Sequence, residues 1–201
     1  FSDTTFIDST TLALLLAASL LLGQKTPATL ALEIRAFAGA EEVTSEARIV
    51  VHRAGERGEP IARAQEQDGR HLFTVAPGIY DAQVVRERDG RVVSIRWAER
   101  LVVMPYPDEG GRHLEVVNFT NGYGALEIRS PRAGGLPDLA IYAAGERSRP
   151  AATPIAGPNG EYALFVVPAG RYDVQVRSAT RPTWHADIEV PLDRTRLWLI
   201  P

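Results

Sequence analysis

The chain of 201 residues contains no cysteine, and Lys25 is its only lysine. The absence of cysteine excludes disulfides, thiolate catalysis, cysteine-ligated zinc and an acylated lipoprotein cysteine. Basic residues number 22 against 25 acidic ones, which gives a net charge of −3 and a surface of mixed sign. A nucleic-acid-binding protein normally shows a clustered basic face, so we expect no nucleic-acid partner.

Long apolar runs are also scarce, and only residues 12–22 form one. Eleven residues rise only about 16 Å on an ideal helix, well short of the roughly 30 Å hydrocarbon core of a bilayer. Extending the segment back to Phe6 brings Asp8 to the membrane boundary. The run is therefore too short for a comfortable span by a single unsupported helix.

Three interpretations of this segment remain open. It is the core of a signal peptide, with a small-residue cleavage site at 26–28. Alternatively it is a retained anchor that tilts or packs against other membrane helices, or a helix buried in a protein assembly. We favour the anchor, and expect residues 1–30 to form an apolar helical segment that contacts the membrane through residues 6–24.

An internal repeat dominates the rest of the chain. The motifs of the first copy recur in the same order in the second, with small insertions where turns are expected, which indicates a duplication. The matched segments are 31–35 with 125–129, 54–57 with 144–147, 60–62 with 154–156, 75–84 with 167–176, and 97–99 with 184–186.

Each copy has the pattern of short strands, and no helical pattern of useful length follows residue 30. Residues 47–51 and 139–142 are short apolar or β-branched runs. Residues 80–84 alternate, so Tyr80, Ala82 and Val84 should share one face of a strand. In the second copy the equivalent residues are Tyr172, Val174 and Val176.

Tight-turn dipeptides separate these runs, and strands at such spacing are typical of a β-sandwich. We therefore predict a mainly β chain with two tandem antiparallel β-sandwich domains behind the short N-terminal helix. The domains should span 31–118 and 125–201, and the linker 119–124 is short enough to fix them closely. The turn signals are Asp68-Gly69, Pro77-Gly78, Asp89-Gly90, Asn159-Gly160 and Ala169-Gly170.

The stretch 168–176, Pro-Ala-Gly-Arg-Tyr-Asp-Val-Gln-Val, resembles transthyretin-like β-sandwich modules, among them the carboxypeptidase regulatory-like and PEGA-like domains of bacterial envelope proteins. The resemblance covers both copies. It implies a stalk, spacer, adhesive or scaffolding role with carbohydrate or protein contacts, and it carries no shared catalytic residues. From this resemblance together with the apolar segment, we expect a membrane-associated chain whose body is periplasmic or extracellular.

The first residues suggest one further alternative. Phe1 before an apolar helix is similar to a mature type IV pilin, although Thr5 stands where those pilins generally carry glutamate. This similarity implies a filament subunit. Lys25, by contrast, would place the body in the cytoplasm under the positive-inside rule.

No residue pattern in the chain indicates catalysis. The four histidines are not at metal-ligand spacing, and we expect each to be solvated or hydrogen-bonded in a strand. The acidic loop 108–111 lacks the alternating oxygen ligands of a calcium loop. We expect no catalytic, cofactor-binding or metal-binding residues and no cofactor. The histidines are His52, His71, His113 and His185.

Residues that match between the copies are expected to serve the scaffold. Asp81 and Asp173 follow the strand-opening tyrosines and should accept hydrogen bonds near the turn. Glu33 and Glu127 alternate with Leu and Ile, as solvent-facing residues do. Trp97 and Trp184 should pack in the core or at a sheet edge, and Trp198 should be half-buried in the last strand, 197–200.

These observations predict a non-enzymatic structural or interaction subunit of a bacterial envelope or membrane-bound complex. Its partners would be other protein subunits of that assembly. A surface module that binds carbohydrate or another ligand through loops at one end of a sandwich is an alternative.

Overall fold

The structure is a computed structural model, and it describes residues 29–67, 69–105, 112–131, 135–177 and 181–201. The predicted apolar helix and membrane contact at 6–24, the loop 108–111 and Asp68 lie outside the described residues. Strands dominate the described part, as the sequence predicts.

The described elements follow one another in two series. The first comprises β1 (Leu30–Ala38), β2 (Glu41–Glu42), the 3-10 turn η1 (Thr44–Glu46), β3 (Ala47–Arg53), β4 (Ala62–Arg63), β5 (Gln65–Gln67), β6 (Arg70–Val75), β7 (Gly78–Arg88), β8 (Arg91–Val103) and β9 (Arg112–Asn118). The second comprises β10 (Tyr123–Arg129), β11 (Asp138–Ala143), β12 (Ile155–Ala156), the 3-10 turn η2 (Pro158–Gly160), β13 (Tyr162–Pro168), β14 (Gly170–Arg177), β15 (Thr183–Val190) and β16 (Thr195–Leu199). Among the described helices, none is long and apolar enough to cross a membrane.

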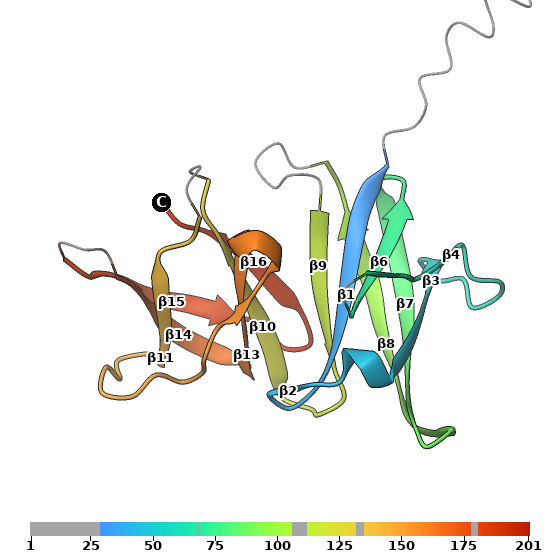
Figure 1. The fold of residues 1–201 in the computed structure, drawn as a ribbon, viewed down its shortest axis with the longest axis horizontal. Helices are drawn as coiled ribbons and strands as arrows, with labels where there is room; N and C mark the ends of the chain where they lie inside the picture. Colours follow the sequence, from blue (N-terminus) through green and yellow to red (C-terminus); the bar gives the residue numbers. More distant parts are fainter. Residues whose placement is uncertain (1–28, 68, 106–111, 132–134, 178–180) are drawn as a thin grey trace, which may run out of the picture.

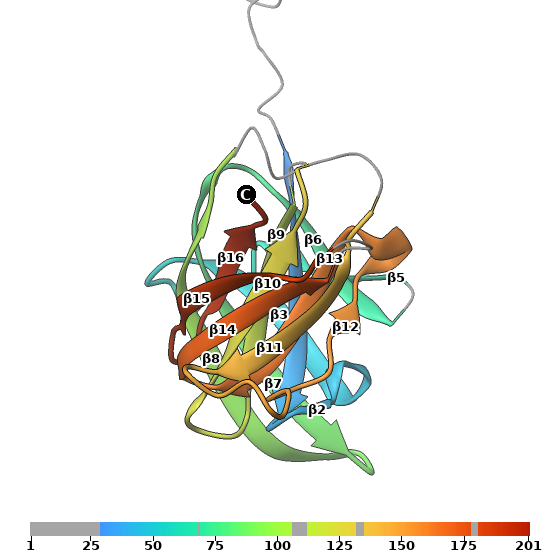
Figure 2. The same cartoon turned by 90° about the vertical axis from the view of Figure 1, so that its left-hand side faces the viewer.

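The strands form four sheets that stack in layers. Sheet A has the order β2-β1-β6-β5 with β9 on the other side of β1, and sheet B has the order β4-β3-β7-β8. Sheet C has the order β12-β13-β10-β16, and sheet D has the order β11-β14-β15. The layers run B, A, C, D from right to left in Figure 1. Figure 2 shows sheet D crossing obliquely in front of sheet C.

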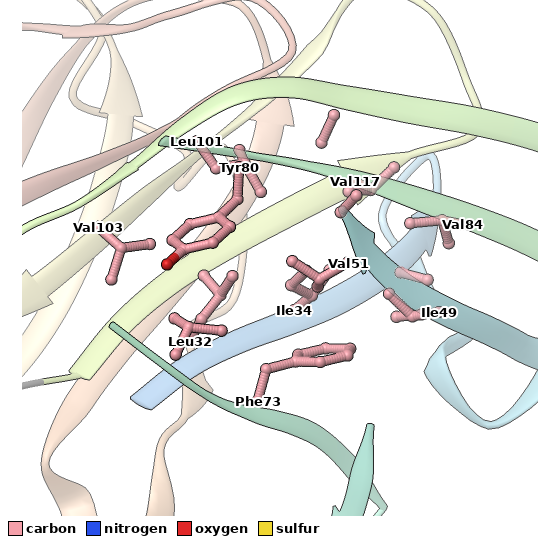
Figure 3. Close-up of a cluster of buried hydrophobic side chains, with 14 of the residues drawn as sticks. Leu32, Ile34, Ile49, Val51, Phe73, Tyr80, Val84, Leu101, Val103 and Val117 are labelled. Atoms are coloured by element: carbon pink, nitrogen blue, oxygen red, sulfur yellow. The ribbon is translucent and has the colours of Figure 1, made fainter. Parts of the chain in front are cut away.

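Three buried apolar clusters lie between successive layers. The first lies between sheets A and B, where Leu32 and Ile34 of β1 pack with Val51 of β3 and Val84 of β7 (Figure 3). The second lies between sheets C and D. Tyr80, Ala82 and Val84 all belong to the first cluster and Tyr172, Val174 and Val176 to the second, which confirms the alternation read from the sequence.

The two halves repeat the same strand pairing. In each half the first strand has one long antiparallel neighbour, β6 beside β1 and β13 beside β10. Its other long neighbour is parallel: β9 beside β1 and β16 beside β10. The sequence pattern predicts antiparallel sheets, and these parallel pairs contradict that prediction. Alternation shows which face a residue occupies but not the direction of the neighbouring strand.

A bulge interrupts the β7–β8 ladder at Asp81. Two residues of β8, Glu99 and Arg100, lie opposite this single residue, and Arg100 has a φ of 57°. Asp81 accepts hydrogen bonds from the backbone N–H of Arg100 at 2.7 Å and of Gly55 at 2.9 Å. The Asp81 carboxylate therefore accepts one backbone N–H from the bulge and one from the turn after β3, which confirms the prediction that it accepts hydrogen bonds near a turn.

The second half repeats this arrangement at Asp173. Asp187, with a φ of 64°, occupies the bulge in β15, and its N–H donates to Asp173 at 3.0 Å. The N–H of Gly145 donates to the other carboxylate oxygen at 3.3 Å. In both halves, then, an aspartate carboxylate accepts the backbone N–H groups of a β-bulge and of the turn beside it.

The third cluster lies between sheets A and C and joins the two halves. Phe37, Leu114 and Val116 of sheet A pack there with Tyr162 and other residues of sheet C. Only residues 119–122 separate β9 from β10.

Glu33 and Glu127 are buried at this junction, and the prediction that they face solvent is wrong. Glu33 is 0% exposed and Glu127 is 2% exposed. Their alternation with Leu and Ile does place them on the outer face of a sheet, but the other half covers that face. A polar residue on an outer face reads as solvent-facing until the contact between the two halves is known.

The buried charge of Glu33 is paired with Arg112 within sheet A and hydrogen-bonded across the junction to Tyr162. Its Oε2 lies 2.9 Å from Nη1 of Arg112, and its Oε1 accepts the hydroxyl hydrogen of Tyr162 at 3.0 Å. Tyr162 belongs to the second half, and burial followed by the charge of Glu33 raises its pKa to about 12. Arg35 also donates to the Tyr162 hydroxyl, at 3.4 Å. The network meets the requirement that a buried charge be paired and hydrogen-bonded.

Candidate functional site

The outer face of sheet B carries a cluster of one tryptophan, one arginine and one histidine. Trp97 lies on β8, the edge strand of the sheet. The guanidinium of Arg57 lies 3.7 Å from the centre of the Trp97 ring, and Arg57 also pairs with Glu99. The His52 ring lies 5.5 Å from the Trp97 ring at 43°. An arginine stacked on an indole gains a cation–π interaction and orients both groups.

The second half carries the matching cluster on sheet D. Trp184 lies on the edge strand β15, Arg147 lies 4.5 Å from its ring centre, and Tyr142 lies 5.1 Å away at 52°. Both tryptophans are half-buried and lie outside the three buried clusters. Of the two predicted roles, packing at the edge of a sheet is the one observed.

The two clusters differ in how their glutamines are used. In the second half, Gln175 accepts a hydrogen bond from Nε of Arg177 at 2.8 Å and lies 3.5 Å from the Tyr142 hydroxyl. In the first half, His52 replaces the tyrosine and Gln83 takes the place of Gln175. The Gln83 side chain has no hydrogen-bond partner among the described residues. We call the second cluster closed, because its glutamine is hydrogen-bonded within the cluster, and the first cluster open, because Gln83 has no such partner among the described residues.

The open cluster lines a groove of about 580 Å³. That volume falls within the usual range of small-molecule sites. The segment from Arg57 to Glu66, which includes β4, forms one wall, because β4 pairs with β3 and extends sheet B. The lining residues are Ala47, Arg48, Ile49, Val50, His52, Arg57, Gly58, Pro60, Arg63, Ala64, Glu66, His71, Gln83 and Trp97.

Charged groups in the groove are partly paired. Arg48 pairs with Glu87 at 3.1 Å, and Arg57 pairs with Glu99. Arg63 and Glu66 have no ion-pair or hydrogen-bond partner within the described part of the chain. The groove therefore offers one unpaired guanidinium and one unpaired carboxylate beside the indole.

Two of the predicted strand histidines line the same groove. His52 and His71 are each 5% exposed, and the Nδ1 of each has no hydrogen-bond partner. Nε2 of His71 lies 3.2 Å from the carbonyl oxygen of Thr44. His113 and His185 lie elsewhere, against Met104 and the Trp198 ring. Within the described ranges, no three His, Cys, Asp or Glu side chains gather as a metal site would require.

A second hollow, of about 730 Å³, opens at the junction between the halves. Arg35, Arg70 and Tyr162 line it. Nε of Arg35 donates to Glu42 at 2.9 Å, and Arg70 lies 3.8 Å from Glu33. These groups already serve the junction, so this hollow offers a ligand less than the groove does.

The sequence contains part of the signal for the groove. The matched Arg57 and Arg147, together with the matched tryptophans, indicate a repeated cluster. The unpaired state of Gln83 and the wall formed by β4 depend on side-chain and backbone positions that the alternation pattern does not encode.

No family model and no curated protein matches the chain. Among solved structures it is similar to the TIE protein of Bacillus anthracis, with 17% identity over 86% of this chain and 33% of that one, and a TM-score of 0.31. It is also similar to the tip fimbrial protein Mfa3 of Porphyromonas gingivalis with a C-terminal truncation, with 10% identity over 86% and 94% of the two chains and a TM-score of 0.31. A tandem pair of titin Ig domains gives 11% identity over 87% and 97%, with a TM-score of 0.20. The chain spans a third of the length of the TIE protein. Scores of this size do not define a shared fold, and no family follows from them.

Proposed function

We propose that the chain is a non-enzymatic structural or interaction subunit of a bacterial envelope or membrane-bound multi-protein complex. Its two halves act as tandem transthyretin-like sandwich domains, and residues 6–24 attach it to the membrane or to neighbouring subunits. The body lies in the periplasm or outside the cell. The observation that carries this proposal is the buried junction between sheets A and C.

The hydrogen bond between Glu33 and Tyr162 joins the two halves and requires them to keep a fixed geometry. If the halves separated, Glu33 would lose the Tyr162 hydroxyl, Arg112 would lose Glu161, and water would reach the apolar side chains of the third cluster. Removing a hydrogen-bond partner from a buried group costs about 1–3 kcal/mol, and more for a charged group. The junction therefore supports a two-domain unit that holds one orientation, as a spacer or scaffold must.

Exposed apolar side chains supply a surface for partners. Of the eight large hydrophobic side chains that are exposed in the described part of the chain, four lie on the edge strand β8. An edge strand that carries exposed apolar side chains can pair with a strand of another protein. The four residues are Val92, Val93, Ile95 and Val102.

Photo-cross-linking in native membranes tests the proposal. A photoreactive residue in place of Ile95 should capture another protein subunit, whereas the same residue in place of the exposed Glu59 should not. Replacing Leu15 and Leu21 with glutamate should release the chain from the membrane fraction. A full-length chain that is monomeric in plain buffer and captures no partner would contradict the proposal.

One observation favours a second function. The groove beside Trp97 supports the alternative of a ligand-binding surface module, because it combines a half-buried indole with unpaired polar groups. The pilin-like alternative predicts cross-links only between copies of the chain, and filaments visible by electron microscopy.

A further inference from the structure

We propose that the groove beside Trp97 binds a sugar that carries a carboxylate, such as a uronic-acid unit of an acidic polysaccharide. This inference deepens the ligand-binding alternative and is independent of the proposed structural role. It depends on a comparison that the duplication itself provides: two equivalent clusters, of which one is closed and the other is open.

The closed cluster defines what the scaffold requires. Trp184, Arg147, Tyr142 and Gln175 contact one another, and these contacts pack the edge of sheet D. The first half retains the stacked arginine and tryptophan but lacks the tyrosine hydroxyl. Its glutamine is left unpaired beside a groove, and packing of the sheet edge does not account for that difference.

The unpaired groups match the parts of an acidic sugar. Arg63 is exposed and has no partner among the described residues, and a guanidinium binds a carboxylate through two parallel hydrogen bonds. Gln83 and Glu66 offer donors and acceptors for ring hydroxyls. Trp97, half-buried with Arg57 stacked over its ring, adds an apolar contact at the wall of the groove.

Arg63 is the charged group of the groove that can select an anion. Of the three arginines that line the groove, Arg48 pairs with Glu87 and Arg57 with Glu99, whereas Arg63 has no partner among the described residues. The His52 and His71 rings, each with Nδ1 unpartnered, leave further hydrogen-bonding capacity unused around the groove. A ligand that lacks a group to match Arg63 or Gln83 forms fewer hydrogen bonds there and binds less tightly.

Calorimetric titration of the full-length chain with three probes tests the inference. The probes are a uronic-acid oligosaccharide, its neutral counterpart of the same linkage, and a short glutamate peptide. The uronic-acid probe should bind at least about tenfold more tightly than the neutral one, and its affinity should fall with added salt. The glutamate peptide should bind more weakly than the acidic sugar.

Matched variants locate the site. Arg63→Gln should weaken binding of the acidic sugar about tenfold and leave the neutral sugar unchanged, because only the charge pair is lost. Trp97→Phe should weaken both sugars, and the equivalent Trp184→Phe should weaken neither. Arg63 is exposed, so we expect the Arg63→Gln variant to fold as the wild type does, and circular dichroism checks this.

Four results would overturn the inference. They are equal affinity for the acidic and neutral sugars, binding of the glutamate peptide alone, equal losses from Trp97→Phe and Trp184→Phe, and no binding of any probe. Equal affinity for the two sugars would still leave the ligand-binding alternative in place, whereas no binding at all would remove it as well. None of these results bears on the cross-linking test of the structural role.

Discussion

At the scale of single residues, the Asp81 carboxylate accepts hydrogen bonds from the backbone N–H groups of Gly55 and Arg100. Desolvation pushes the pKa of its carboxyl group upward, but hydrogen bonds from Arg100 and Gly55 more than offset this, so the pKa lies below its usual value of 3.8. We expect Asp81→Asn to lower the free energy of unfolding by about 1–3 kcal/mol, since a charge-assisted acceptor of two backbone N–H groups is lost. Urea denaturation at pH 7 measures the change.

Asp173→Asn is the matched variant, because Asp173 has the same two kinds of partner. A similar loss there is expected, whereas Asp89→Asn, in an exposed turn that also suits asparagine, should change little. The folded pKa of Asp81 is depressed, so its contribution is present above the unfolded pKa and disappears as the pH falls through the folded pKa. Equal stability of wild type and Asp81→Asn at pH 7 would show that the carboxylate does not hold the bulge.

At the scale of elements, Gly124 in β10 marks a place where two backbones touch. A Cβ atom there would lie 1.9 Å from the carbonyl oxygen of Pro191. The backbone of the loop before β16 would have to move, and the 2.9 Å hydrogen bond from Asp193 to Tyr123 would be strained. We expect Gly124→Ala to lower the free energy of unfolding by about 2 kcal/mol or more, as overpacking against a backbone does.

Gly58 provides the control for this substitution. It has open space around its Cα, and Gly→Ala at a compatible position is neutral or stabilising by about 0.4–1 kcal/mol. Thermal denaturation of Gly58→Ala and Gly124→Ala side by side separates the steric effect from a general effect of alanine. An unchanged melting temperature for Gly124→Ala would mean that the loop yields easily.

Elements were also the scale at which the sequence was most informative. Alternation around Tyr80 and Tyr172 placed the core residues correctly. The Asp89-Gly90 turn, with φ values of 52° and 72°, joins β7 and β8 as predicted. The sequence does not predict the parallel pairing of β9 with β1 or of β16 with β10, because the side-chain period of a strand is two whichever way its neighbour runs. Burial of Glu33 was missed because it depends on the other half, and the groove because it depends on the path of β4.

At the scale of the whole molecule, Glu115 links the halves through β9 and β16. Its Oε1 accepts the backbone N–H of Thr195 at 2.9 Å, and the Thr195 hydroxyl accepts the N–H of Val116 at 2.7 Å. Burial raises the pKa of Glu115 to about 7, although the charge of Arg194 and the bonds from Thr195 act to lower it. The nearby Glu127 adds to the increase. The junction therefore contains a carboxyl group that titrates near neutral pH.

The sign of the resulting pH dependence follows from the two states. Unfolded Glu115 loses its proton near pH 4.5, whereas the folded chain keeps it until about pH 7. Between these values the folded state binds more protons, so the free energy of unfolding falls as the pH rises. We expect this group to contribute a decline on the order of 1–3 kcal/mol between pH 5 and pH 8. Glu115→Gln should remove that decline, which urea denaturation at several pH values measures.

Urea denaturation at several pH values also tests whether the two halves unfold as one cooperative unit. Glu115 lies between the halves, so its protonation should affect the stability of both if the junction holds them together. Trp97→Phe leaves Trp184 and Trp198, both in the second half, whereas the double variant Trp184→Phe/Trp198→Phe leaves only Trp97, in the first half, so the fluorescence of each variant reports on one half. Transitions that shift together with pH in both variants indicate a single cooperative unit. Transitions that separate, with only one of them sensitive to Glu115→Gln, would contradict a rigid junction and weaken the case for a spacer.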